Sequence, residues 1–356
     1  MADISLDDLI KAKTQTMDNN ADAQNWQVMT KKEEIEQVTK QTELISPEVT
    51  SLEAVKTEYS PSVIALGTFD GLHLGHQDII KTARDYAQKH GLKLIVFTFS
   101  NHPLSLIKPD LVPVRIITQQ QKIKYLEKLG VDILVNVPFD HDLAGLSPDE
   151  FLKKLAVFNY RCLVVGENFS YGFLGSGKTD TLQRTGLHDH FTVIIRQLVK
   201  CGKNVISSTG IRSLIQAGHV EHANQMLGRA YALTGIVTHG AQRGRTIGFP
   251  TANIELQRSE TAVPATGGYA VKVKVGDKLY FGMANIGNNP TFGDVEHARL
   301  EVNLFDFKGD LYGREITVYF YKYIRGEEKF ASIDELKARI TEDRENIKNY
   351  FQCYKK

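Results

Sequence analysis

The clearest chemical signal in the sequence is the run Gly67–His76, which reads GTFDGLHLGH. Backbone at glycines can approach a phosphate closely, and the free N–H groups at the start of a helix favour anions. His73 and His76 are three residues apart, so on a helix they share one face and can donate to the same phosphates. One surface histidine in a turn would mean little, but this pair around a glycine predicts a phosphate-binding turn.

A second anion-binding pattern is the segment ISSTGIR at residues 206–212. Hydroxyl groups precede a predicted helix start there, and Arg212 follows one turn later. On its own the pattern is weak, because serine and threonine before a helix often only cap it. Together with the first run, it predicts two anion-binding sites that face one nucleotide.

The second half of the chain contains the run GRTIGFPTAN at residues 244–253. Thr251 and Asn253 are two residues apart and therefore lie on one side of a strand. A hydroxyl and an amide oxygen suit Mg²⁺, which prefers oxygen ligands. Further along, Glu301 sits among apolar residues in a predicted strand. Such a carboxylate is either an ion-pair partner at the rim or a base in a partly dry site.

A third run, Gly172–Thr179, matches the P-loop pattern G-x-x-x-x-G-K-[ST]. A P-loop should begin almost at the end of its strand, yet Glu167–Tyr171 intervene here. No aspartate stands where the metal-binding acid of such proteins is expected. We interpret the match as chance, with a P-loop NTPase kept as an alternative.

The elements that must position these residues follow two different rhythms. Between residues 61 and 228, short apolar strands alternate with helices, which is typical of parallel βαβ units in a doubly wound sheet. Ligands bind such sheets beyond the carboxyl ends of the strands. Strands are predicted at 63–66, 94–97, 133–137, 163–165 and 193–195, and helices at 76–90, 119–129 and 148–158, the last capped by Ser147.

From about residue 229 the pattern changes to period-two alternation, which predicts a small antiparallel barrel or sandwich. A closing helix at 333–351 follows, with Ser332 and Glu335 as a capping box. The predicted strands are 231–239, 249–256, 269–275, 279–286, 300–307 and 315–323. The predicted domains are therefore 61–228 and 229–352.

Composition excludes several classes of protein. The 356 residues are 42% hydrophobic and 24% charged, which is typical of globular domains, and the net charge of +1 argues against a nucleic-acid binder. No apolar run reaches the length of a membrane helix, and three widely spaced cysteines make no disulfide framework, so a reduced cytoplasmic protein is expected. Residues 1–60 hold six lysines against twelve acidic residues and no glycine, and they predict an acidic, flexible leader.

These runs resemble the bifunctional bacterial riboflavin kinase/FMN adenylyltransferase family, known as FAD synthetases. The first run looks like the signature of the adenylyltransferase domain, and the series from residue 244 to residue 330 matches the kinase domain in order. The resemblance implies a nucleotidyltransferase-like α/β domain before a kinase barrel. It also implies that His73 and His76 contact the ATP phosphates, that Glu301 is the kinase base, and that Thr251 and Asn253 are metal and phosphate ligands.

The resemblance also supplies a set of nucleotide- and flavin-binding residues. They are Gly67, Phe69, Asp70, Gly71, Gly75, Asn101, Asn168, Ser208, Thr209, Arg212, Gly244, Arg245, Gly248 and Arg325. Two positions depart from the family pattern: Asn168 replaces an aspartate expected near the flavin, and Asn303 replaces a histidine.

The implied function is phosphorylation of riboflavin to FMN and then adenylyl transfer from ATP to FMN, which gives FAD. The implied partners are Mg²⁺ as Mg-ATP, riboflavin, FMN and FAD, without nucleic acid or membrane, and a homo-oligomer is left open. One alternative is a riboflavin kinase whose adenylyltransferase domain is weakened, suggested by Asn168. Another is a flavin-sensing regulator without catalysis, against which the Glu301, Thr251 and Asn253 set argues.

Overall fold

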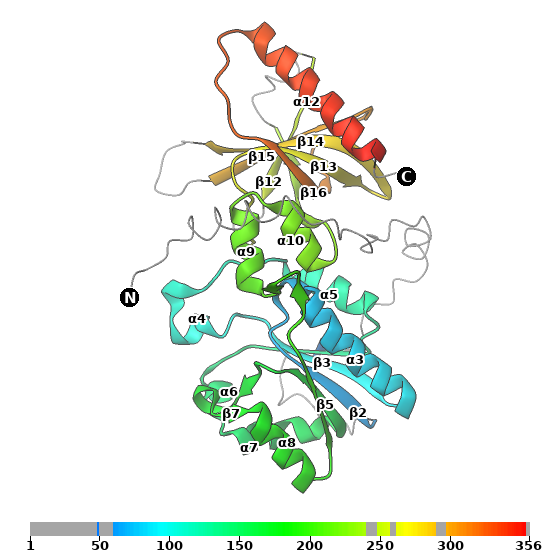
Figure 1. Ribbon diagram of the computed structural model, residues 1–356, viewed down its shortest axis with the longest axis vertical. Coiled ribbons are helices and arrows are strands. Elements are labelled where there is room, and N and C mark those ends of the chain that lie inside the picture. The colour runs from blue at the N-terminus through cyan, green and yellow to red at the C-terminus, as the bar shows by residue number, and fades with distance from the viewer. Residues whose placement is uncertain (1–47, 50–59, 240–247, 257–260, 290–296, 354–356) are drawn as a thin grey trace. The chain divides into compact units, whose positions relative to one another are not determined.

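The computed structural model describes residues 48–49, 60–239, 248–256, 261–289 and 297–353. These residues form a parallel α/β domain, a closed antiparallel barrel and a C-terminal helix (Figure 1). Both predicted architectures are confirmed, and the choice left open between a barrel and a sandwich is decided for the barrel.

The first domain is built on a parallel sheet with strand order β1-β4-β3-β2-β5-β8. Its first long strand, β2, lies in the middle, and the chain then winds outward to β3 and β4 before it crosses to β5. The carboxyl ends of β2 and β5 therefore mark the point where the strand order reverses, which is where sheets of this kind bind ligands. The strands are β1 (Glu48–Val49), β2 (Ser62–Leu66), β3 (Lys93–Phe99), β4 (Ile133–Val137), β5 (Tyr160–Gly166) and β8 (Thr192–Arg196).

Alternating side chains of β2 enter two separate cores, one on each face of the sheet. Val63 and Ala65 pack with Ile80 of helix α3 (Leu74–His90), while Ile64 packs with Phe151 of helix α7 (Pro148–Leu155). Helix α8 (Thr179–His188) shares the α7 side through its buried leucine. All these β2 side chains are fully buried, so the strand is held rigidly on both faces.

The remaining elements of this domain are short. They are η2 (Asp70–Leu72), α4 (Leu104–Ile107), η3 (Pro109–Leu111), α5 (Gln119–Lys128), α6 (His141–Gly145), η4 (Ala156–Phe158), β6 (Ser170–Tyr171), η5 (Phe173–Gly175), β7 (Gly177–Lys178), β9 (Lys200–Cys201), β10 (Asn204–Val205), α9 (Ser208–Gln216) and α10 (Val220–Leu227). The predicted cap of α7 is confirmed, because Ser147 Oγ accepts from the Glu150 N–H and the Glu150 carboxylate accepts from the Ser147 N–H.

The second domain is a six-stranded barrel closed in the order β11-β12-β15-β14-β13-β16, with every neighbouring pair antiparallel. Closure removes exposed sheet edges and fills the interior with side chains. The strands are β11 (Tyr231–Thr238), β12 (Ala252–Leu256), β13 (Gly267–Val275), β14 (Lys278–Asn289), β15 (His297–Leu304) and β16 (Glu315–Arg325).

Helix α12 (Ile333–Cys353) covers part of the outside of the barrel. Ile347 and Phe351 are buried against Ala270 and Phe305, and the Phe351 ring stacks on Phe281 with centroids 4.7 Å apart. The Lys272 ammonium lies 5.5 Å from the centre of the Phe351 ring, which adds a cation–π contact to this seam. The predicted cap is present, since Ser332 Oγ accepts from the Glu335 N–H.

The segment that resembles a P-loop forms a small hairpin instead. Ser170 pairs with Lys178 and Tyr171 with Gly177, so the glycine-rich residues lie between two short antiparallel strands. A P-loop instead wraps from the end of a central parallel strand into a helix. The prediction that this match is a chance similarity agrees with the structure.

Two residues of the predicted leader belong to the sheet. Glu48 and Val49 pair in parallel with Leu134 and Val135 as the edge strand β1. The rest of segment 1–60, apart from Ser60, lies outside the described residues. In the part of the chain that the structure describes, none of the helices has the length and apolar character needed to cross a membrane.

The seam between α12 and the barrel should depend strongly on Phe351. Replacing it with alanine removes a ring that is 2% exposed, so we expect Phe351→Ala to lower the free energy of unfolding by about 3–5 kcal/mol. Urea unfolding followed by circular dichroism measures this. Gln352→Ala, at an exposed neighbour on the same helix, is the matched control and should change it by less than about 0.5 kcal/mol. Equal effects of the two variants would show that α12 is not held through this seam.

Candidate active sites

The run Gly67–His76 forms a tight turn at the carboxyl end of β2. Phe69, Gly71 and Leu72 all have positive φ angles, of 50°, 79° and 42°, and the Phe69 ring is fully buried beneath the turn. Glycine is required at position 71, because a Cβ there would approach the Ile116 side chain to 2.8 Å in addition to the strained φ. The turn therefore leads directly into the N-terminus of α3 at the predicted ligand edge of the sheet.

The Asp70 carboxylate joins this turn to two other segments. Asp70 Oδ1 accepts from the Ile116 N–H at 3.1 Å, and Asp70 Oδ2 forms an ion pair with Arg212 Nη2 at 3.4 Å. Ser208 Oγ also donates to the Asp70 carbonyl oxygen at 2.9 Å. The two predicted anion motifs are therefore adjacent in space, and Asp70 is the residue that connects them.

Two cations, buried Lys122 and half-buried Arg229, contact the backbone of the turn. Lys122 Nζ donates to Thr98 Oγ1 at 2.6 Å and to the Thr68 carbonyl oxygen at 2.9 Å. Arg229 donates to the carbonyl oxygens of Gly71 and Leu72 at 2.6 and 3.0 Å, and its guanidinium lies 4.1 Å from the centre of the Tyr125 ring. The two side chains therefore satisfy carbonyl groups of the turn and place positive charge next to its backbone.

The two histidines stack on each other and are neutral at pH 7. Their ring centroids are 3.6 Å apart, and His73 Nδ1 accepts from the His76 N–H, which leaves the proton of the neutral His73 ring on Nε2. Burial lowers the pKa of His73 to about 4, and the Arg229 guanidinium adds to this shift. Burial also holds the pKa of His76 well below its ordinary value, with His73, Lys122 and Arg229 lowering it further.

Lys122 is a group that ordinarily carries a charge at pH 7, and here its side chain is buried. Burial lowers the pKa of Lys122 to about 7, while the nearby Asp70 carboxylate works against that shift. The positive potential of the turn at neutral pH thus depends on Arg212, Arg229 and a partly protonated Lys122. His73 and His76 can act there as neutral hydrogen-bond donors.

Asn101 has a structural role that sequence reasoning did not anticipate. Its amide accepts from the Phe139 N–H at 2.6 Å and donates to the Phe139 carbonyl oxygen and to Ser105 Oγ. The side chain therefore ties the segment after β3 to the segment after β4. Asn168 lies exposed in the loop after β5, on the other side of the point where the strand order reverses.

At the second anion motif, the helix cap is Ser207, whose Oγ accepts from the Gly210 N–H. Ser208 is used by Asp70, as described above, and Thr209 is exposed at the first turn of α9. Arg212 is 11% exposed, so its charge points into the site and not into solvent. Of the three predicted residues, Thr209 is the one left most accessible to a ligand.

In the barrel, Glu301 and Asn253 are brought together across β12 and β15. They are direct partners in the strand register, and Asn285 of β14 faces Glu301 from the other side. A third residue joins them: Arg299 Nε donates to Asn253 Oδ1 at 2.7 Å and lies 3.0 Å from Glu301 Oε1. Glu301 is 33% exposed, so part of its side chain is accessible to solvent.

The segment before β12 is held by the same face of β15. Asn303 Nδ2 donates to the Pro250 carbonyl oxygen at 2.6 Å and so positions Thr251, which is half-buried. Gly248 has a φ of 86° and lies in the turn before that segment. Gly244 and Arg245, which the resemblance also implied as ligands, lie outside the described residues.

Arg325 ends β16 and is anchored to helix α12. Arg325 Nε pairs with Asp343 Oδ2 at 2.7 Å, and Asp343 is almost completely buried. Glu328 lies 3.8 Å from the same guanidinium. The closing helix therefore fixes the side chain that the resemblance implies for FMN binding.

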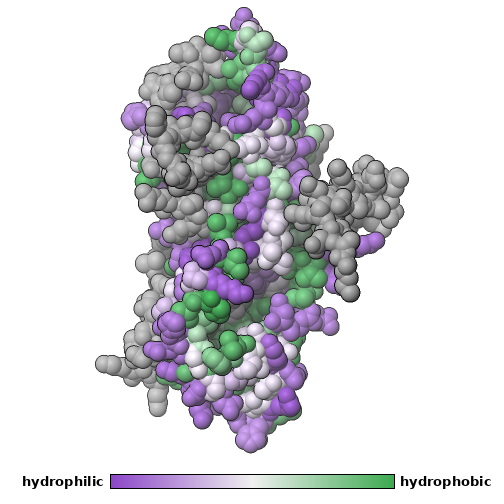
Figure 2. All heavy atoms as spheres, turned by 90° about the vertical axis from the view of Figure 1, so that its left-hand side faces the viewer, coloured by the Kyte–Doolittle hydropathy of each residue, from purple (hydrophilic) through white to green (hydrophobic). Residues whose placement is uncertain are grey.

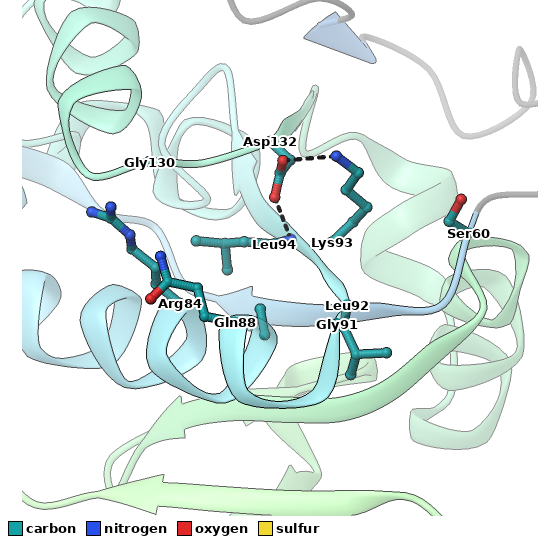
Figure 3. Close-up of a pocket in the computed structure, with 10 residues that line it drawn as sticks. Ser60, Arg84, Gln88, Gly91, Leu92, Lys93, Leu94, Gly130 and Asp132 are labelled. Atoms are coloured by element: carbon teal, nitrogen blue, oxygen red, sulfur yellow. Dashed lines mark hydrogen bonds and ion pairs between the residues drawn. The ribbon is translucent and has the colours of Figure 1, made fainter.

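A cavity of about 460 Å³ lies at the opposite edge of the parallel sheet (Figure 3). It is lined by residues at the end of α3 and at the beginning of β3 and β4, including Arg84, Lys93 and Asp132, and Lys93 Nζ pairs with Asp132 Oδ1 at 3.1 Å. These are the amino ends of the strands. The cavity is separate from the turn that carries the histidines.

Figure 2 shows hydrophobic side chains gathered in patches among hydrophilic ones on one face of the molecule. Several large apolar side chains in the described residues are exposed, among them Ile107, Leu111, Phe173 and Leu174. They come from α4, η3 and η5, which are the segments that follow β3 and β6.

Comparison with known proteins agrees with this geometry. The FAD synthetase family model matches residues 55–210, and the riboflavin kinase family model matches residues 227–351. The bifunctional riboflavin kinase/FMN adenylyltransferase of Bacillus subtilis (strain 168) is 42% identical over 306 residues, which cover 85% of this chain and 96% of that protein. The protein of the same name from Escherichia coli (strain K12) is 38% identical over 292 residues, or 81% of this chain and 92% of its own.

This chain belongs to the bifunctional riboflavin kinase/FMN adenylyltransferase family. A solved structure from Streptococcus pneumoniae, described as a macrolide-efflux protein, is also similar, with a TM-score of 0.79 and 36% identity. The match covers 85% of this chain and 98% of that one. The predicted resemblance is confirmed, and the P-loop look-alike lies within the FAD synthetase match.

The sequence analysis did not single out three charged residues that contact the candidate sites. Lys122 carried a signal, because it precedes Leu126 and Leu129 by four and seven residues and so shares the buried face of its helix. Arg299 carried one too, since it alternates with Glu301 on one face of a strand. Arg229 carried none, because its contacts with the turn come from residues more than 100 positions earlier.

The neutral state of His73 predicts a specific acid sensitivity. Burial lowers the pKa of His73 from 6.5 to about 4, so between these values the unfolded chain binds a proton that the folded chain does not. The stability of the neutral ring is therefore fully present above pH 6.5 and is lost as the pH falls towards 4. We expect His73→Asn, which keeps a cap acceptor but does not titrate, to flatten the fall in unfolding free energy between pH 7 and pH 5. Denaturant unfolding at both pH values tests this. The exposed His141→Gln is the control, and the same slope in all three proteins would contradict it.

Proposed function

We propose that this chain makes FAD in two ATP-dependent steps, one in each domain. In the barrel, riboflavin is phosphorylated to FMN. In the α/β domain, FMN is adenylylated to FAD with release of pyrophosphate. Membership of the bifunctional family and a match to both family models support the two-step reading over a kinase with a weakened second domain.

The observation that carries the kinase step is the pairing of Glu301 with Asn253 across β12 and β15. The Glu301 carboxylate accepts the proton of the ribityl 5′-hydroxyl. The hydroxyl oxygen then forms a bond to the γ-phosphorus of ATP as the bond to the β-phosphate oxygen breaks, which gives FMN and ADP. Such transfers are accelerated mainly by positioning and by charge neutralisation, since little covalent work is left to the protein.

Thr251 and Asn253 suit Mg²⁺ in the kinase site by the chemistry of their donors. A hydroxyl and an amide oxygen are hard ligands, and the two residues lie two positions apart on the segment that Asn303 holds. When bound with the nucleotide, Mg²⁺ would neutralise charge on the transferred phosphate. In the described residues no cluster of three or more histidine, cysteine or acidic side chains offers an all-protein metal cage.

The adenylyltransferase step needs no general base, because the attacking FMN phosphate is already anionic. Its oxygen forms a bond to the α-phosphorus of a second ATP, and pyrophosphate leaves. The turn supplies neutral donors from His73 and His76 and positive charge from Arg212, all at one edge of the sheet. Thr209, Gly75 and the amides at the start of α3 and α9 complete the proposed nucleotide contacts.

The remaining site residues are proposed with more limited roles. Gly67 and Phe69 shape the turn, Asp70 holds it to α9, and Asn101 shapes the adjoining edge of the site. Asn168 lies where the flavin is expected, and Arg325 contacts the FMN formed in the barrel. Gly248 leads into the proposed phosphate-binding segment. The net charge of +1 argues against a nucleic-acid partner.

Chromatography of the purified chain with riboflavin, ATP and Mg²⁺ tests the proposal. FMN should form first and FAD should follow, and FMN supplied directly should also be converted to FAD. Accumulation of FMN without FAD would support the kinase-only alternative. Neither product would support a binding protein, and ATP hydrolysis lost specifically in Lys178→Ala would support a P-loop enzyme.

Removal of the proposed base should separate the two activities. Because Glu301→Gln keeps the shape of the side chain but cannot take a proton, we expect riboflavin phosphorylation to fall by about 10²- to 10⁴-fold. Conversion of supplied FMN to FAD should be unchanged. Rates of FMN and FAD formation measured by chromatography give both values. Glu315→Gln, at an exposed position on β16, is the matched control, and full kinase activity in Glu301→Gln would rule out this base.

A further inference from the structure

The Arg299 guanidinium binds two proposed kinase-site residues at once. Arg299 Nε donates to Asn253 Oδ1 at 2.7 Å, and Arg299 Nη2 donates to the same oxygen. Arg299 Nε also lies 3.0 Å from Glu301 Oε1. One cation therefore contacts both the amide oxygen proposed for the metal and the carboxylate proposed as the base.

This arrangement follows from the alternation of β15. Arg299, Glu301 and Asn303 lie on one face of the strand, while Leu300 and Val302 are fully buried on the other face. Asn253 is the direct cross-strand partner of Glu301, so Arg299 reaches it on the diagonal. Asn303 meanwhile holds Pro250 of the same segment. Arg299 and Asn303 thus contact segment 250–253 directly, and Glu301 contacts Arg299.

The Asn253 amide oxygen accepts from two donors of the guanidinium fork, Nε and Nη2. A divalent cation that needs this oxygen must therefore displace the arginine. The ion pair with Glu301 holds Arg299 there only weakly, because the two side chains are 34% and 33% exposed and pairs this accessible to solvent contribute little. At Asn253, which is 8% exposed, the incoming metal would replace the arginine as the partner of the oxygen. The hydrogen bonds to Asn253 thus keep Arg299 in the site until a metal ion takes that oxygen.

We propose that Arg299 is the resting counter-ion of the kinase site, a positioning residue that competes with Mg²⁺ for the Asn253 carbonyl oxygen. In the nucleotide-free chain the guanidinium holds Asn253 and Glu301 together. Loading of the metal nucleotide requires Arg299 to leave Asn253. This inference rests on the proposed kinase function of the barrel.

The test measures metal dependence without turnover. The full-length chain is mixed with riboflavin and ADP, and quenching of riboflavin fluorescence is followed as free Mg²⁺ is raised. Arg299→Met keeps the length of the side chain but removes its charge and donors. We expect it to lower the half-saturating free Mg²⁺ by about two- to fivefold. Arg299→Lys keeps the charge without the two-pronged fork and should give a smaller decrease.

Lys278→Met is the matched control, because it removes an exposed cation from the hairpin between β13 and β14 and should leave the half-saturating Mg²⁺ unchanged. An unchanged or higher requirement in Arg299→Met would overturn the inference, as would weaker ADP binding at saturating Mg²⁺ with an unmoved metal midpoint. Should Arg299→Met fail to fold, the direction of the shift in Arg299→Lys decides. Absence of riboflavin phosphorylation in the unmodified chain would instead overturn the proposed function itself.

Discussion

The candidate site of the α/β domain depends on the contacts of the Asp70 carboxylate with Ile116 and Arg212. Asp70 is 16% exposed, and an ionised carboxylate placed there is stable only when its oxygens are paired and hydrogen-bonded. The Ile116 amide and the Arg212 guanidinium meet that need, and the backbone of Asp70 also receives the Ser208 hydroxyl. Three segments far apart in sequence are thereby held at the one edge of the sheet where the strand order reverses. The resemblance implied a ligand at Asp70, but in the structure its oxygens hold the site's own parts together.

Burial leaves the proposed phosphate-binding turn with both neutral and charged groups. A histidine pair at this position suggests two cations, yet burial and nearby positive groups lower the pKa of both rings and favour the neutral forms. Two like charges 3.6 Å apart would repel strongly, so neutral rings are what allow the stack to exist. Positive charge then comes from arginines and from Lys122, whose ammonium binds carbonyl and hydroxyl oxygens beneath the turn. In the barrel, by contrast, the charged group is accessible: Arg299 binds the amide oxygen proposed for the metal and the carboxylate proposed as the base.

The fold and the positions of the candidate motifs within it were predictable, because they rest on local patterns. Strand alternation, glycine-rich turns and capping residues are written in consecutive residues, and Ser147 and Ser332 cap helices as predicted. The partners of polar side chains were not predictable in this way. The expected ligand contacts of Asn101 and Ser208 stay predictions, and nothing in the sequence indicated that Asn101 bonds to Phe139 or that Ser208 bonds to Asp70. An amide or hydroxyl satisfies any nearby donor or acceptor, so its partner depends on what the fold brings close.

The sequence by itself determined two domains of different periodicity and the family to which they belong, and it singled out Glu301, Asn253, His73 and His76 as the residues proposed for the chemistry. These follow from residue type and spacing along a helix or strand, which are short-range properties. Only the tertiary structure decided that Arg299 binds Asn253 and Glu301, that Arg229 holds Gly71 and Leu72, and that the histidines are neutral. Charge state and hydrogen-bond partners depend on burial and on contacts between distant segments, and neither exists until the chain has folded.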